Sequence, residues 1–235
     1  MKNQSKERAA SDASGGGILA RPFVVLCLFL GLFTAALGWG WLSQTPSQEE
    51  LYGDTGRFVH EFKTHFLEGK LAWWSPNFMQ GGSSAGYFAV SFVLLIATVL
   101  EHFFGNPAGI KLLGLLTIPA AGLAAYAFVR KLTGNGWTGF LAGVLYATNA
   151  QILLRIASFE HQASAVAYVF VPLILLCFIK VAEEGSWRAS ALLGLVWSAL
   201  MLTYAKLAFM FLPFALVFYV WLMREYPSRR TVLVR

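Results

Sequence analysis

The chain has 235 residues, of which 57% are apolar, 15% are aromatic and only 13% are charged. A soluble globular domain carries about 25% charged residues, so this composition excludes an ordinary soluble domain and predicts a membrane protein. The apolar residues come in runs near the roughly 20 that a helix needs to cross about 30 Å of hydrocarbon. These runs lack the two-residue alternation of barrel strands. We therefore expect an all-α fold, a polytopic bundle of transmembrane helices.

The formal net charge of +6 is concentrated at the ends of the apolar runs. This placement indicates an orientation signal and a contact with anionic membrane lipids. No basic face is interleaved with aromatic residues outside the apolar runs, which excludes nucleic acid as a partner. Cys27 and Cys177 both fall within apolar runs, where a free thiol behaves as a small hydrophobic side chain. The motifs of soluble nucleotide-binding enzymes are absent.

Residues 1–21 are polar and rich in Ser, Gly and Ala, and their basic residues outnumber the acidic ones. We expect a disordered tail in the cytoplasm. The first predicted span, residues 22–42, ends in Trp39 and Trp41, which suit the far membrane interface. A cleaved signal peptide is the alternative, but the apolar run is longer than the usual 7–15 residues and lacks a small-x-small site. A retained helix is therefore favoured.

Residues 43–109 form the predicted first outer loop. Within it, residues 54–67 place three phenylalanines on one helical face, which suits a helix lying on the membrane. The apolar run 87–104 either crosses the membrane or lies in the outer leaflet. If it crosses, the later basic loops fall outside, against the positive-inside rule. We therefore expect this run to lie in the membrane plane.

The remaining chain contains five further apolar runs, so the prediction is about six spans with both termini in the cytoplasm. Gly134 and Asn135 supply the backbone freedom for a tight turn between two of them. The transmembrane module covers residues 22–223, and residues 224–235 form a basic cytoplasmic tail. The five later spans are predicted at residues 110–129, 137–154, 163–179, 189–204 and 207–223.

Under this topology three polar sites meet on the outer face: Asp54, the pair Glu160 and His161, and Lys206. A carboxylate at an interface can deprotonate an acceptor hydroxyl or bind a divalent cation, and a second acidic or histidine residue can share either task. A lysine near the outer leaflet can bind a phosphate. Structural alternatives stay open, because Asp54 can cap a helix, Glu160 and His161 can be a solvated loop, and Lys206 can be an interfacial anchor.

Two tryptophans in the outer loop, Trp73 and Trp74, suit stacking on a sugar ring. They suit an aromatic belt at the membrane interface equally well, since both uses exploit a flat apolar face with an N–H at its edge.

Several short motifs occur together in and after this loop. They are Gly53-Asp54-Thr55, residues 66–71, Trp74-Ser75-Pro76-Asn77, Gly81-Gly82, an aromatic and apolar run that ends in Phe104-Gly105, and residues 132–134 and 139–147. In combination they resemble the first outer loop of GT-C fold glycosyltransferases, and most of all the bacterial YfhO-like and 6-pyruvoyl-tetrahydropterin-synthase-related membrane-protein branches. The resemblance covers roughly residues 22–219.

The resemblance implies that Asp54 is the catalytic or metal-associated carboxylate, with Mg²⁺ or Mn²⁺ as the metal. It implies a second acidic or histidine site, which matches Glu160 and His161. The implied donor is a polyprenyl-phosphate-linked sugar, transferred on the extracytoplasmic face of a bacterial inner membrane. The candidate substrate-binding residues are Lys206 for the donor phosphate, with Trp73, Trp74 and Asn77.

The chain departs from this superfamily in length, because its members usually continue for several more spans. A truncated relative is therefore expected. Two hypotheses follow: a lipid-phosphosugar-dependent transferase, or a non-catalytic membrane subunit that keeps the fold and packs against other subunits of a larger membrane complex.

Overall fold

The computed structural model describes residues 21–42, 91–105, 108–157 and 162–225. This part of the chain contains helices and no strand, which confirms the all-α prediction. The helices are α2 (Pro22–Leu42), α6 (Ser91–Phe104), α7 (Ala108–Thr133), α8 (Gly136–Ala147), α9 (Ala150–Ala157), α10 (Gln162–Glu184) and α11 (Trp187–Glu225).

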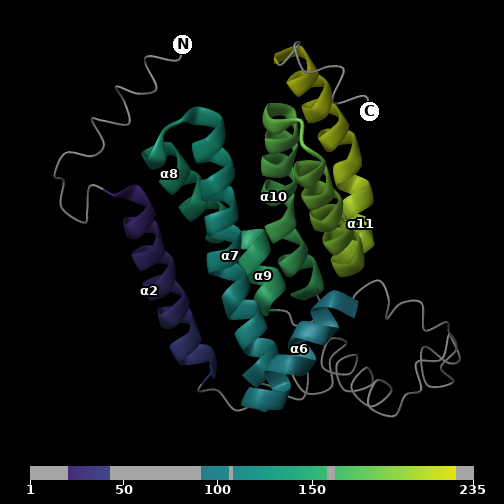
Figure 1. The fold of residues 1–235 in the computed structure, drawn as a ribbon. Helices are drawn as coiled ribbons and strands as arrows, with labels where there is room; N and C mark the ends of the chain where they lie inside the picture. The colour runs from purple at the N-terminus through teal and green to yellow at the C-terminus, as the bar shows by residue number, and fades with distance from the viewer. Residues whose placement is uncertain (1–20, 43–90, 106–107, 158–161, 226–235) are drawn as a thin grey trace, which may run out of the picture.

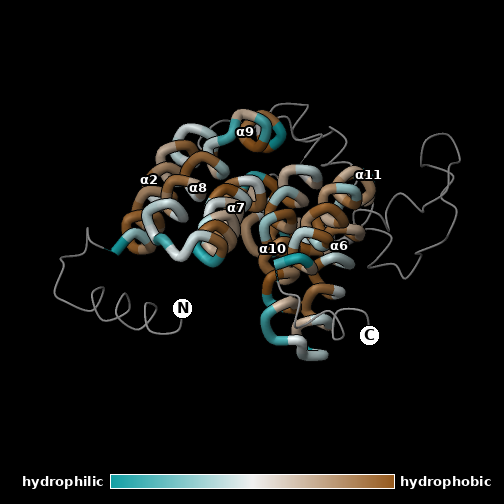
Figure 2. Tube along the Cα trace, turned by 90° about the horizontal axis from the view of Figure 1, so that it is seen from above, coloured by the Kyte–Doolittle hydropathy of each residue, from teal (hydrophilic) through white to brown (hydrophobic). Residues whose placement is uncertain are grey.

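Helix α7 is the centre of the bundle. Helices α2 and α8 pack against each other and against α7, while α10 packs on α7 and carries α11 on its far side (Figures 1 and 2). Glycines permit the close approach of α8, since a Cβ at Gly143 would lie 2.8 Å from the carbonyl oxygen of Gly122. In lipid no hydrophobic driving force holds helices together, so their association depends on close packing. Small residues allow the two backbones to approach closely enough for that packing.

Helix α11 is two antiparallel limbs joined at Tyr204, whose φ and ψ of −159° and 84° are not helical. The rings of Trp197 and Phe211 stack with centroids 6.2 Å apart, although they would be about 21 Å apart along a straight helix. Leu222, near the end of α11, packs with Ile179 near the end of α10. The chain therefore reverses at Tyr204 and returns to the end of the bundle where α11 begins (Figure 1).

The two ends of the bundle differ in character. We call one the α6 end, since α6 lies obliquely across it, together with the start of α7, the end of α9 and the reversal of α11 (Figure 1). The other we call the basic end, because most of the described cations lie there, as the predicted topology requires. The residues that define the basic end are Arg21, Arg130, Lys131, Lys180, Arg188 and Arg224.

The described part of α6 does not by itself cross a bilayer, because its 14 residues rise about 21 Å, against a hydrocarbon thickness of about 30 Å. It joins α7 through Gly105, whose φ of 79° favours glycine. Gly109 then allows contact between the two helices, since a Cβ there would lie 2.7 Å from Cα of Glu101. For residues 91–104 these features agree with a helix in the membrane plane. Residues 87–90 lie outside the described part, so the placement of the whole run stays a prediction.

By length and composition, four described helices could cross a membrane: α2, α7, α10 and α11, the last counted as one helix although it reverses at Tyr204. A fifth span results if α8 and α9 are one broken span, with a bend of 42° between them. The predicted count of six is not confirmed. The two terminal tails and the predicted surface helix at residues 54–67 lie outside the described residues.

The predicted turn between residues 129 and 137 is present and its mechanism is visible. Gly134 ends α7 with a φ of 71°, and its N–H donates to the carbonyl of Arg130. Asn135 then caps α8, because its side-chain oxygen accepts from the N–H groups of Trp137 and Thr138 at 2.8 and 3.3 Å.

Candidate functional site

Of the residues predicted for the site, Lys206 lies in the described part of the chain. It is exposed and follows the reversal at Tyr204, so it belongs to the α6 end, the end predicted to hold the site. The other predicted residues, Asp54, Trp73, Trp74, Asn77, Glu160 and His161, lie outside the described residues. The helices that flank them, namely α2, α6, α9 and α10, meet at this same end (Figure 1).

Arg155 is a second cation of this end, and sequence reasoning did not count it among the site residues. It is half-buried in α9, donates from Nη1 to Oγ of Ser164 at 2.7 Å, and lies 5.9 Å over the ring of Tyr168. These contacts hold the guanidinium beside α10. An arginine at the edge of an apolar run is itself a functional signal in the sequence.

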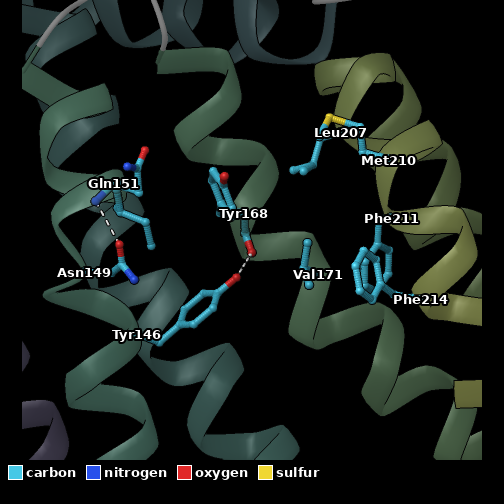
Figure 3. A pocket seen from close by; sticks show the side chains of 10 residues that line it. Tyr146, Asn149, Gln151, Tyr168, Val171, Leu207, Met210, Phe211 and Phe214 are labelled. Carbon is cyan, nitrogen blue, oxygen red and sulfur yellow. Dashed lines mark hydrogen bonds between the residues drawn. The ribbon is translucent and has the colours of Figure 1, made fainter.

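A groove opens between α8, α9, α10 and α11 (Figure 3). Its volume is about 380 Å³, within the usual range for small-molecule sites. Its α11 wall is apolar, while Tyr146, Asn149, Gln151 and Tyr168 supply polar groups on the other side. The apolar lining consists of Ile152, Val171, Leu207, Met210, Phe211 and Phe214.

The two cations lie at the same end of this groove. Gln151 and Leu207 are toward one end, and Tyr146 and Phe214 are toward the other (Figure 3). Arg155 follows Gln151 by one helical turn, and Lys206 directly precedes Leu207. Arg155 and Lys206 do not line the groove themselves, but each lies close in sequence to a lining residue at its α6 end. An apolar wall with cations beyond one end suits a long apolar molecule with an anionic head.

A proline in α10 shapes the wall of the groove. Pro172 has no N–H, so the carbonyl of Tyr168, four residues earlier, loses its helical donor. The hydroxyl of Tyr146 in α8 donates to this carbonyl at 2.8 Å. One hydrogen bond thus satisfies the interrupted helix and ties α8 to α10 across the base of the groove.

Lys111 is a third cation of the α6 end, and it is 2% exposed. Its Nζ donates at 3.0 Å to the carbonyl of Trp41, near the C-terminus of α2. This carbonyl is one of the last four of the helix, which have no intrahelical donor, and a lysine there also complements the helix dipole. Lys111 therefore fastens α2 to α7 at this end.

In the residues that the structure describes, no group of three His, Cys, Asp or Glu side chains could hold a metal ion. The metal predicted at Asp54 concerns a residue outside that part. Comparison of the chain with protein-family models, with curated proteins and with solved structures found no match.

Proposed function

We propose that this chain is a membrane transferase that moves a sugar from a polyprenyl-phosphate donor to an acceptor hydroxyl at the α6 end. The observation that carries the proposal is the groove of about 380 Å³, with Arg155 one helical turn beyond its lining residue Gln151 and Lys206 next to its lining residue Leu207. A polyprenyl phosphate ester presents the matching chemistry, since its chain is apolar and its phosphate accepts charge-assisted hydrogen bonds.

The helices that flank the segments with Asp54 and with Glu160 and His161 also support a site at the α6 end. Asp54 lies between α2 and α6, and Glu160 and His161 lie between α9 and α10. The flanking helix ends are at the α6 end, so both segments are attached where the groove opens (Figure 1). The helices that flank the proposed base therefore end at the same end of the bundle as the proposed phosphate ligands.

The proposed reaction is a displacement at the anomeric carbon. The acceptor hydroxyl oxygen forms a bond to C1 of the sugar while the bond from C1 to the phosphate oxygen breaks. The hydroxyl proton passes to the carboxylate of Asp54, assisted by Glu160 or His161. The polyprenyl phosphate leaves with the electron pair of the broken bond, and Arg155 and Lys206 stabilise the charge that develops on it.

The test uses inverted and right-side-out membranes that contain the chain, supplied with polyprenyl-phosphate-linked radiolabelled hexoses. We expect Asp54→Asn to lower sugar transfer by about 10²- to 10⁴-fold, the usual contribution of a positioned base. Asp12→Asn, a change in the predicted cytoplasmic tail, is the matched control and should leave transfer unchanged.

The phosphate ligands are tested by Arg155→Gln and Lys206→Gln, which should raise the KM for the donor. Equal transfer by the wild type and Asp54→Asn would overturn the proposal. A wild-type chain that consumes no donor but purifies at fixed stoichiometry with other membrane proteins would favour the non-catalytic subunit.

A further inference from the structure

A second cleft lies at the basic end, away from the groove. It is open, with a volume of about 660 Å³, and it follows one face of α7 between α2 and α10. Leu123, Ala127, Arg130 and Gly134 recur at intervals of three and four residues, so they form one stripe along α7. Phe23 of α2 and Leu176 of α10 form the two sides.

The cleft combines an apolar floor with a fixed cation at its rim. Arg130 lies 5.8 Å over the ring of Tyr126, and its Nη1 donates to the hydroxyl of that tyrosine at 3.4 Å. The ring of Tyr126 in turn contacts Phe23, with centroids 5.6 Å apart. The guanidinium is thus oriented before any ligand binds, and most of its N–H donors are left for an anion.

The charges around the rim leave a positive surplus. Lys131 pairs with Glu183 at 2.7 Å, and Lys180 pairs with Glu184 at 3.8 Å, so these carboxylates are neutralised locally. Arg130 forms no ion pair with a residue in the described ranges. Its position at the end of a spanning helix, above an apolar cleft, is where a lipid phosphate would lie.

We propose that this cleft binds one anionic phospholipid, with the phosphate on Arg130 and an acyl chain along Leu123 and Ala127. This inference is independent of the proposed transferase activity, because it uses the opposite end of the bundle. A structural anchor would need only a cation near the interface. A binding site needs the oriented guanidinium and the apolar cleft together, which is what these residues provide.

The chain offers a matched control. Arg188 also belongs to the basic end, is exposed, and lies 5.8 Å over the ring of Trp187, but it does not line the cleft. The experiment titrates the purified, delipidated full chain with phosphatidylglycerol or phosphatidylcholine and counts bound lipids by native mass spectrometry. We expect the wild type to prefer phosphatidylglycerol by about fivefold, the factor typical of one cation near an anionic lipid.

Arg130→Gln should abolish this preference, Arg130→Lys should keep most of it, and Arg188→Gln should leave it unchanged. Ala127→Phe fills the cleft and should lower the binding of both lipids. Soluble glycerol phosphate at millimolar concentration should not displace the lipid, because the acyl chain contributes to binding. Equal losses in Arg130→Gln and Arg188→Gln would overturn the proposal, as would unchanged lipid binding by Ala127→Phe or displacement by glycerol phosphate.

Discussion

The hydrogen bond between Tyr146 and Tyr168 gives the sharpest test of how the groove is built. Tyr146→Phe removes only the hydroxyl, and the carbonyl of Tyr168 then has neither that donor nor an N–H from Pro172. Leaving a buried polar group unsatisfied costs about 1–3 kcal/mol in proteins. Interhelical hydrogen bonds in membranes average about 0.6 kcal/mol, with a maximum of about 1.7 kcal/mol.

Tyr146 is half-buried and its hydrogen bond is short, at 2.8 Å. We therefore expect the cost of losing this bond to lie between the membrane average and the upper value for a buried unsatisfied group. Tyr146→Phe should lower the free energy of unfolding by about 1 kcal/mol, which is about a fivefold change in the equilibrium constant. The assay is reversible unfolding of the purified chain in mixed micelles, followed by circular dichroism and extrapolated linearly to zero denaturant.

A double-mutant cycle isolates the role of the proline. With Pro172→Ala, position 172 regains an N–H that can donate to the carbonyl of Tyr168. The loss caused by Tyr146→Phe should therefore fall to less than half in that background. Equal losses in the two backgrounds would refute the reasoning, because the hydroxyl would then not be compensating for the missing helical donor.

Three further predictions concern the packing that positions the site. Lys111→Met removes the charged hydrogen bond to the Trp41 carbonyl and should lower the free energy of unfolding by about 1.5–3 kcal/mol; no change would contradict the role of Lys111 in fastening α2. Gly109→Ala should lower the free energy of unfolding by about 1–3 kcal/mol, because the new Cβ would meet the backbone of α6. The control is Gly31→Ala, whose Cβ would have no atom within 4 Å and should not destabilise the chain. Equal effects of the two changes would contradict the close approach of α6 and α7. Alanine substitutions at Trp197 and Phe211 should show a coupling energy of about 0.5–1.5 kcal/mol in a double-mutant cycle, and additive losses would contradict the reversal of α11.

The sequence predicted the features that depend on local composition. The apolar run at residues 22–42 coincides with α2, and the turn at Gly134 and Asn135 uses the positive φ and the helix cap expected of those residues. The all-α class follows from composition, because apolar runs without a two-residue alternation can cross a bilayer only as helices. Each of these properties is set within a few residues, so a single sequence shows it.

The bend between α8 and α9 was missed, although a local signal for it exists. Residues 137–154 were predicted as one span, but Asn149 begins a new helix, and its side-chain oxygen accepts from the N–H of Gln151 at 2.8 Å. Asparagine is a preferred capping residue because its short side chain competes with the helical backbone bonds. Giving the capping preference of Asn149 more weight than the apolar run would have predicted the break between α8 and α9.

The cations of the α6 end show what a single sequence lacks. Lys111 stands at the start of an apolar run, where a lysine normally reaches into the interface, yet it is 2% exposed and donates to a carbonyl 70 residues earlier. Arg155 likewise acquires its place from Ser164 and Tyr168 on the following helix. Such partners are chosen by tertiary packing. The arrangement of these cations is therefore a product of how α2, α7, α9 and α10 meet.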